Sequence, residues 1–159
     1  MQHANAQFSV LFVCLGNICR SPIAQGVFGA VASTRGQGGR TMVGSAGTGG
    51  WHVGSPPDPR AEAVAARHGI DIGRQRCRRI EADDFSHFDL ILGMDRANVR
   101  ELLTIAPPRA TGKIHLFLDY AQGEAVDVPD PYYGGPDGFE TVYRMIRKGS
   151  EALASRLWP

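Results

Sequence analysis

The chain contains the stretch Val10-Leu-Phe-Val-Cys14-Leu-Gly-Asn-Ile-Cys-Arg20-Ser-Pro22, from which the rest of the sequence is best interpreted. Its first residues are apolar and partly β-branched over the length of a buried strand. The sequence then becomes polar, contains a glycine and reaches Ser21-Pro22. Serine is a favoured N-cap, and proline is favoured at the first helical position because its missing N–H would be unpaired there. The pattern therefore predicts a strand, a short loop and a helix capped by Ser21.

This segment also predicts a particular chemistry. Successive backbone N–H groups ahead of a helix N-terminus form a concave anion site, and a nearby arginine can hold two phosphate oxygens. A cysteine in such a field has its pKa lowered from about 8.5 to roughly 3.5–7.5, which favours the thiolate. We therefore expect Cys14 to attack phosphorus in a phosphate bound above it. The alternative is a structural cysteine beside an unrelated surface arginine. The expected phosphate-binding residues are Leu15, Gly16, Asn17, Ile18, Cys19 and Arg20.

Length and composition indicate one globular domain. The chain has 159 residues, of which 43% are hydrophobic, and this is enough for a core. We expect a flexible extension over residues 1–7 and a single domain over residues 8–159. The net charge of +1 gives no indication of nucleic acid or an anionic membrane as a partner.

Cysteine usage and the N-terminus indicate the compartment. Three cysteines, an odd number without a small-scaffold spacing, favour a reducing environment over a disulfide framework. The first seven residues lack a basic region, and the apolar run after them is too short for a signal or transmembrane segment. The expected location is therefore the cytoplasm.

Predicted strands and helices alternate along the chain, which is typical of a parallel sheet covered on both faces. Ligands of such folds bind at the carboxyl ends of the strands, where the first strand places Cys14. The further strands are expected at 40–44, 88–93 and 113–118, the helices at 23–34, 59–68, 96–103 and 139–157, and the main loops at 45–50 and 126–138.

Two motifs and the order of elements resemble the low-molecular-weight protein tyrosine phosphatases. The first motif is Cys14-Leu-Gly-Asn-Ile-Cys-Arg20-Ser-Pro, the second is Asp130-Pro-Tyr-Tyr-Gly134, and the likeness extends from about Phe8 to Leu157. The resemblance implies a single-domain, three-layer α/β sandwich with a four-stranded parallel sheet flanked by helices. It also implies a metal-independent hydrolase of phosphotyrosine that uses no cofactor.

The resemblance assigns a role to each catalytic residue. Cys14 is implied as the nucleophile that forms a phosphocysteine, and Arg20 as the residue that holds the phosphoryl oxygens. Asp130 is implied as the acid that protonates the leaving phenolate and then as the base for hydrolysis. Asp130 stands between two prolines, which reduces the entropy cost of positioning it. Taken alone, it would more readily be interpreted as a turn residue, because Asp-Pro favours turns, and the Cys14 loop reverses this preference.

Supporting residues follow from the same resemblance. Ser21 is implied to hydrogen-bond the thiolate as well as to cap the helix. Asn17 is expected in a left-handed backbone conformation, which asparagine tolerates better than most residues. The resemblance implies that Ser45 and His68 hold Asn17. For His68 the alternative is a histidine that interacts with the dipole at a helix C-terminus.

The expected pocket has aromatic walls. Tyr132 and Tyr133 are expected on one side and Trp51 on the other, although Trp51 could instead belong to the core. A deep aromatic slot suits a phenyl phosphate better than a short phosphoserine. The implied partners are phosphotyrosine-containing proteins and a tyrosine kinase that phosphorylates the paired tyrosines, and the protein is expected to be a monomer.

Cysteine chemistry provides both a regulatory expectation and an alternative function. The resemblance implies a reversible disulfide between Cys14 and Cys19 that protects the nucleophile from over-oxidation. An arsenate reductase on the same scaffold would need two further cysteines, but only Cys77 lies beyond the loop. A phosphotyrosine-binding regulator without turnover is the other alternative.

The basic run Arg74-Gln-Arg-Cys-Arg-Arg79 is interpreted as a solvated face that would also attract an acidic phosphopeptide.

Overall fold

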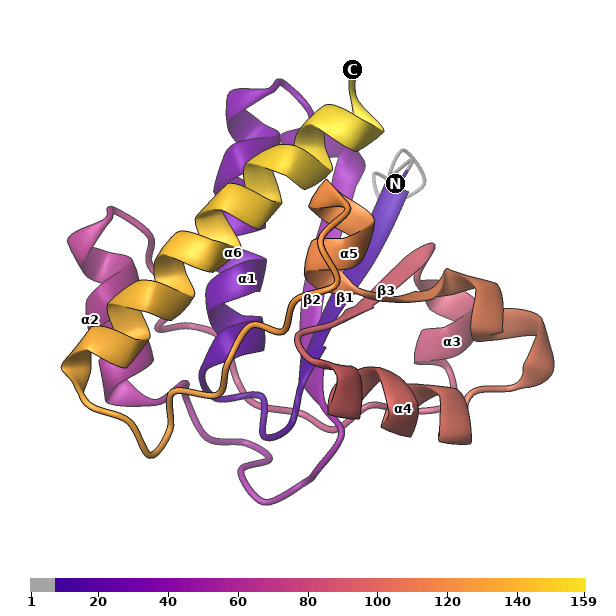
Figure 1. Cartoon of the computed structure of the whole chain (residues 1–159), viewed down its shortest axis with the longest axis horizontal. Helices are drawn as coiled ribbons and strands as arrows, with labels where there is room; N and C mark the ends of the chain where they lie inside the picture. The colour runs from indigo at the N-terminus through magenta and orange to yellow at the C-terminus, as the bar shows by residue number, and fades with distance from the viewer. Residues whose placement is uncertain (1–7) are drawn as a thin grey trace.

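A four-stranded parallel sheet in the order β2–β1–β3–β4 forms the centre of the computed structural model, which describes residues 8–159 (Figure 1). The expected extension over residues 1–7 lies outside the described residues. All three ladders are parallel, so every strand ends at the same edge of the sheet. The strands are β1 Phe8–Cys14, β2 Thr41–Gly47, β3 Leu90–Gly93 and β4 Ile114–Leu116.

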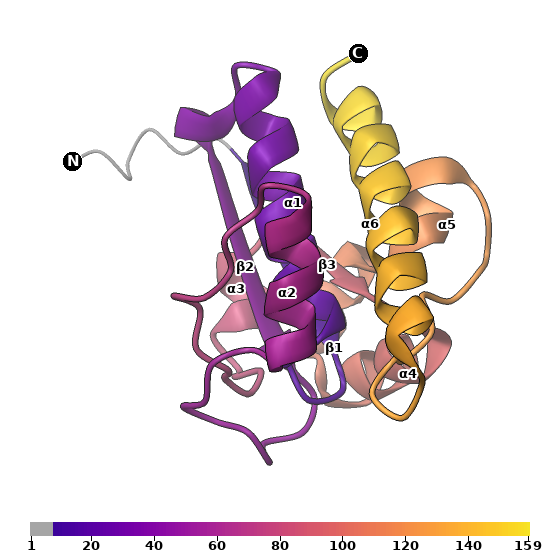
Figure 2. The ribbon, with the colours of Figure 1, turned by 90° about the vertical axis from the view of Figure 1, so that its left-hand side faces the viewer.

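Helices cover both faces of this sheet, which confirms the predicted three-layer α/β fold. Helices α1, α2 and α6 lie on one side, and α3 and α4 lie on the other (Figures 1 and 2). The α-helices are α1 Arg20–Thr34, α2 Pro59–Arg67, α3 Asp84–His87, α4 Arg96–Ile105, α5 Phe117–Gln122 and α6 Pro136–Leu157. Short 3-10 helices, η2 and η3, span Gly38–Arg40 and Pro108–Lys113.

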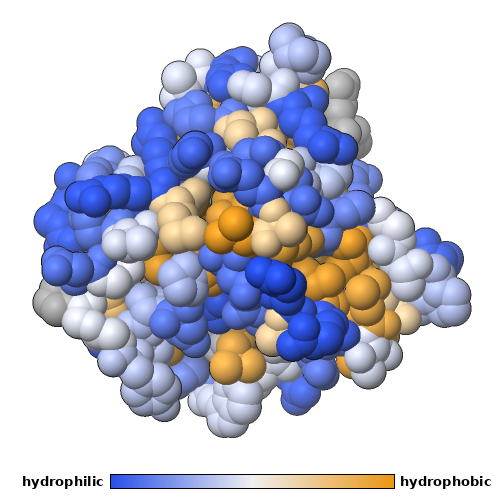
Figure 3. Space-filling model, viewed as in Figure 1, coloured by the Kyte–Doolittle hydropathy of each residue, from blue (hydrophilic) through white to orange (hydrophobic). Residues whose placement is uncertain are grey.

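The central strand β1 is buried on both faces, as its continuous apolar run predicts. Val10 and Phe12 pack into the core beneath α1 and α6, whereas Leu11 and Val13 belong to a separate core beneath α3 and α4. The outward sides of α2 and α6 are mainly hydrophilic (Figure 3). The end of β1 therefore lies between two packed layers.

Two helix starts are confirmed by their side-chain caps. Asp58 accepts the Arg60 N–H at 2.8 Å, and a proline follows it at the first helical position. Asp95 accepts the Asn98 N–H at 2.8 Å, while the Asn98 side chain accepts the Asp95 N–H at 3.0 Å. This reciprocal pair is a capping box, and it fixes where α4 begins.

The predicted cap at Ser21 is wrong. Helix α1 begins one residue earlier, at Arg20, and Cys19 occupies the cap position without a side-chain hydrogen bond. The Ser21 hydroxyl lies in the first turn and is used by Cys14 and Asn17 instead. The serine therefore serves the loop in front of the helix.

Several element boundaries also differ from the prediction. Strand β2 runs on to Gly47, so Ser45-Ala-Gly47 is not a turn but pairs with the end of β1. Strand β4 ends at Leu116, because Phe117 and Leu118 turn into α5 and pack in the core beside α6. Helix α6 starts at Pro136, three residues earlier than expected, and proline is favoured in a first turn. Strand β3 starts at Leu90, and the short helix α3 before it was not predicted.

Within residues 8–159, the helices are too short or too polar for any of them to cross a bilayer.

Candidate active site

The loop between β1 and α1 connects a buried cysteine to a buried arginine. Cys14 is the last residue of β1 and is buried, and Arg20 is the first residue of α1. Asn17, in the middle of the loop, has φ of 59°, as predicted from its tolerance of left-handed backbone. This left-handed residue lets the short loop turn between the end of β1 and the start of α1.

A buried hydrogen-bond network holds this turn. The Arg78 N–H donates to Asn17 Oδ1 at 2.8 Å, which fixes the orientation of the side-chain amide. Asn17 Nδ2 then donates to Ser21 Oγ at 2.8 Å and to Ser45 Oγ at 3.0 Å. Ser21 Oγ lies 3.0 Å from Cys14 Sγ, and since a thiolate can only accept, the Ser21 hydroxyl donates to this sulfur when Cys14 is ionised. The network thus provides a hydrogen-bond donor to the sulfur.

His68 does not take part in this network, so its predicted contact with Asn17 is wrong. It lies at the C-terminal cap of α2, where its ring stacks on Tyr143 with centroids 3.9 Å apart. Its Nε2 is 2.8 Å from the Glu140 carboxylate. The alternative prediction, a histidine at a helix C-terminus, describes its position correctly. The donor that replaces His68 is the backbone N–H of Arg78, which no side-chain pattern could have indicated.

Arg20 is only 2% exposed, so its charge needs partners inside the protein. Its Nη1 donates to Asp95 Oδ2 at 2.6 Å and to the Val128 carbonyl at 3.0 Å. Burial alone would lower the pKa of Arg20, but the nearby Cys14 and Asp95 raise it, so the guanidinium stays charged. One Asp95 oxygen caps α4, and the contact of its second oxygen with Arg20 was not predicted from the sequence.

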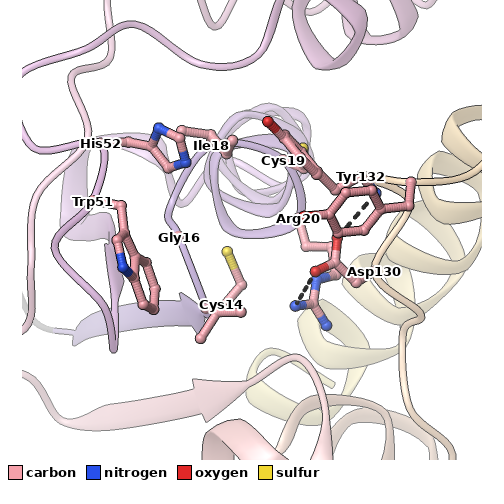
Figure 4. A pocket seen from close by; sticks show the side chains of 11 residues that line it. Cys14, Gly16, Ile18, Cys19, Arg20, Trp51, His52, Asp130 and Tyr132 are labelled. Carbon is pink, nitrogen blue, oxygen red and sulfur yellow. Dashed lines mark hydrogen bonds and ion pairs between the residues drawn. The ribbon is translucent and has the colours of Figure 1, made fainter.

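The segment before α6 brings Asp130 to the same site. Its anchor is Val128, which is buried and donates its N–H to the Met94 carbonyl at 2.9 Å. The Asp130 side chain is 43% exposed, and its Oδ2 lies 3.6 Å from Arg20 Nη2 (Figure 4). The predicted meeting of Cys14, Arg20 and Asp130 is therefore present in the structure.

These groups line a cavity of about 350 Å³. Trp51 is 71% exposed and stands opposite Tyr132, with the Cys14 sulfur between them (Figure 4). Trp51 is therefore a wall residue and not part of the core. Tyr133 is 94% exposed at the mouth, and His52 is a lining residue that the sequence did not indicate. The complete lining is Cys14, Leu15, Gly16, Ile18, Cys19, Arg20, Trp51, His52, Asp130, Tyr132 and Tyr133.

Burial disfavours the thiolate form of the other two cysteines. Burial, together with the negative charge of Asp58, raises the pKa of Cys19 strongly. Burial likewise raises the pKa of Cys77 to about 11. Both therefore stay neutral near pH 7, and the Cys77 thiol donates to the Asn17 carbonyl at 2.8 Å.

Gly47 allows the loop to pack closely against β2. A Cβ at this position would lie 2.8 Å from the Leu15 carbonyl oxygen and 3.1 Å from the Asn17 nitrogen. These neighbours are backbone atoms, so a larger residue would displace the loop. Gly47 was expected in the loop over residues 45–50, and no sequence pattern indicated this requirement.

Comparison with known proteins identifies the family. The family model described as low molecular weight phosphotyrosine protein phosphatase matches residues 9–158. The Homo sapiens protein of the same name is 44% identical over 150 residues, covering 93% of this chain and 94% of the relative. The Bacillus subtilis low molecular weight protein-tyrosine-phosphatase YfkJ is 41% identical over 150 residues, covering 94% and 95%.

A solved structure agrees with these matches. A protein tyrosine phosphatase from Entamoeba histolytica superposes with a TM-score of 0.90 at 36% identity, covering 95% of this chain and 97% of that one. The family match extends over almost every residue that builds the fold and the site. The chain therefore belongs to the low molecular weight phosphotyrosine protein phosphatase family.

Proposed function

We propose that this protein hydrolyses phosphotyrosine in proteins, and small aryl phosphates, through a phosphocysteine intermediate on Cys14. The observation that carries the proposal is the convergence of Cys14, Arg20 and Asp130 on one cavity with aromatic walls. Substrate phosphate would lie over the loop amides of residues 15–20, at the positive end of α1. Since Arg20 Nη1 is held by Asp95 and Val128, the Nε and Nη2 hydrogens remain for two phosphoryl oxygens.

In the first step, the Cys14 thiolate attacks phosphorus from the floor of the cavity. The S–P bond forms and the bond between phosphorus and the phenolic oxygen breaks. Asp130, at the open side of the site, gives its proton to the leaving oxygen. Such general acid assistance typically contributes about 10²–10⁴-fold in rate. The Ser21 hydroxyl stays on the sulfur and steadies its negative charge before attack.

In the second step, water attacks the phosphocysteine. Asp130, now a carboxylate, accepts a proton from this water as the new P–O bond forms. The S–P bond breaks, phosphate leaves, and the Cys14 thiolate is restored with the Ser21 hydroxyl again as its donor. Arg20 holds the equatorial oxygens in both steps, so the same electrostatic contact serves two transition states.

The walls of the cavity support an aryl substrate. Trp51 and Tyr132 face each other across the site, so a flat phenyl ring fits between them (Figure 4). The arsenate reductase alternative is disfavoured by the family match and by Cys77, whose buried thiol is bonded to the loop itself. A binding module without turnover is disfavoured because nucleophile, arginine and acid are all in place.

We extend the proposal to regulation by oxidation and phosphorylation, to the oligomeric state and to the location in the cell. Peroxide would oxidise Cys14 to a sulfenic acid, and the Cys19 thiol would then displace water to form a disulfide that thiols reduce. Tyr132 and Tyr133 lie at the mouth of the cavity, where a tyrosine kinase could phosphorylate them. The protein would act as a monomer in the cytoplasm, with residues 8–159 as the phosphatase domain.

The direct test is turnover of p-nitrophenyl phosphate and a phosphotyrosine peptide in reductant, with and without chelator. The wild type should hydrolyse each substrate at the same rate with and without chelator. The Cys14→Ser variant should hydrolyse neither substrate. Asp130→Asn should slow turnover about 10²-fold or more while inorganic phosphate still binds. Absence of turnover by the wild type at mildly acidic pH would overturn the proposal. For the disulfide, peroxide-treated Cys19→Ser should recover less activity on thiol addition than the wild type, and equal recovery would refute it.

A further inference from the structure

A second cavity of about 690 Å³ adjoins the catalytic one and has no part in the chemistry above. The two cavities share Leu15 and Trp51, so the indole separates them and belongs to both. The second cavity is lined by Leu15, Thr48, Gly49, Gly50, Trp51, Arg79, Ala97, Asn98 and Glu101. A ligand that fills the catalytic cavity and continues past Trp51 would enter this space.

Backbone hydrogen bonds join the second cavity to the loop between β1 and α1, residues 14–20, which we call the phosphate loop. The Thr48 N–H donates to the Cys14 carbonyl at 3.0 Å, and the Gly49 N–H donates to the Leu15 carbonyl at 2.8 Å. The Trp51 ring rests on Gly49 so closely that a Cβ there would lie 1.8 Å from the ring. The position of the second cavity relative to Cys14 is therefore set by backbone contacts.

Arg79 is the cation of this cavity. Its Nε donates to the Thr48 carbonyl at 3.2 Å, and its stem lies against Gly50. Among residues 8–159, no carboxylate forms an ion pair with Arg79. The preceding residue differs, because Arg78 is neutralised by Asp84 through contacts of 2.9 and 3.0 Å. Arg79 is thus held in place at one nitrogen, with its terminal nitrogens available for an anion.

We propose that the second cavity is a subsite for substrate residues that flank phosphotyrosine, and that Arg79 binds an acidic side chain there. The inference rests on the proposed function, since the phosphotyrosine ring must occupy the neighbouring cavity. An extended peptide advances about 3.3–3.6 Å per residue, so residues within about three positions of the phosphotyrosine reach the subsite. Because the Arg79 side chain is positively charged, the proposed occupant of the subsite is an acidic phosphopeptide.

Glu101 limits how many acidic residues of a peptide the subsite is expected to accept. It lines the same cavity, one turn of α4 after Ala97 and Asn98. Its negative charge opposes an acidic peptide, so the subsite should accept one carboxylate beside Arg79 and disfavour a run of them. Glu101→Gln should therefore increase the preference for acidic peptides, whereas Arg79→Gln should remove it.

The experiment compares kcat/KM for phosphotyrosine peptides with alanine flanks and peptides with one glutamate at each of three positions on either side. The matched control is Arg74→Gln, because Arg74 is an exposed arginine of the same basic run and lines neither cavity. For the wild type we expect one glutamate position to raise kcat/KM about three- to tenfold, the range between an exposed and a partly desolvated ion pair. Arg74→Gln should keep this preference.

Turnover of p-nitrophenyl phosphate separates the possible failures, because this substrate does not reach the second cavity. It should be unchanged in Arg79→Gln and Arg74→Gln. The preference of the wild type for the glutamate-containing peptide should also decrease as the salt concentration rises, since Arg79 is exposed. No preference in the wild type, or a preference that survives Arg79→Gln, would overturn the subsite while p-nitrophenyl phosphate turnover persists. Absence of that turnover in the wild type would instead overturn the proposed function.

Discussion

The ion pair between Arg20 and Asp95 should support both stability and catalysis, and Asp95→Asn isolates its contribution. Asparagine and aspartate are comparable N-caps, so this substitution can keep the cap of α4. One Asp95 oxygen accepts the Asn98 N–H, and the other faces Arg20 Nη1. The asparagine side chain has a single oxygen, so it cannot satisfy both donors. The buried guanidinium would then face an N–H₂ group in place of a carboxylate.

The expected magnitude follows from the burial of the pair. Hydrogen bonds to charged groups contribute about 1.5–3 kcal/mol. The Arg20 side chain is 2% exposed and that of Asp95 21%, so solvent screens the contact only in part. Because Arg20 keeps its bond to the Val128 carbonyl, we expect the free energy of unfolding to fall by about 2 kcal/mol. For a domain of this size, that lowers Tm by about 4–8 °C.

Thermal unfolding and steady-state kinetics would measure the effect together. With its guanidinium no longer held, Arg20 should stabilise the transition state less, and kcat/KM for p-nitrophenyl phosphate should fall about tenfold for each 1.4 kcal/mol lost. The control is Glu151→Gln, which removes exposed pairs with Arg147 and Arg35 and should cost less than about 1 kcal/mol. An Asp95→Asn variant with the wild-type Tm and kcat/KM would refute the reasoning.

Three further perturbations test other parts of the site and its surroundings. Gly47→Ala should weaken inhibition by inorganic phosphate about tenfold or more, because the added Cβ meets loop backbone at 2.8 Å; an unchanged inhibition constant would contradict this. Iodoacetamide near pH 7 should modify Cys14, and peptide mapping should find Cys77 labelled only as pH approaches its pKa of about 11; equal labelling at pH 7 would be the contrary result. Asp58→Ala should lower the free energy of unfolding by about 1 kcal/mol through loss of its cap. The hydrogen bond from Arg60 lowers the pKa of Asp58, so this advantage should be present above pH about 4 and fade at lower pH, and a pH-independent difference would count against it.

The opening strand, loop and helix could be predicted because their signals are local. Apolar β-branched residues, a left-handed asparagine and a cysteine followed five residues later by an arginine all lie within one short segment. The motif around Asp130 was equally visible, and the ends of parallel strands bring such segments together. The fold class and the central residues of the site therefore followed from the sequence.

The remaining features depend on contacts between distant segments. Ser45-Ala-Gly47 has no strand propensity, yet it extends β2 because β1 pairs with it and the phosphate loop needs a residue without a Cβ. The support of Asn17 by the Arg78 backbone leaves no side-chain pattern, and His68 was chosen wrongly in its place. The contact from Asp95 to Arg20 requires β3 to lie beside β1, which the sequence alone does not reveal.

The most direct measurement is a rapid acid quench during turnover of a radiolabelled phosphotyrosine peptide, followed by peptide mapping. The proposed mechanism predicts a transient phosphoryl label on Cys14, formed together with a burst of dephosphorylated peptide and absent from Cys14→Ser. It further predicts that Asp130→Ala slows both formation and decay of the label, since Asp130 serves as acid and then as base. Rapid turnover without any label on Cys14, or with the label on another residue, would contradict the assignment of Cys14 as the nucleophile.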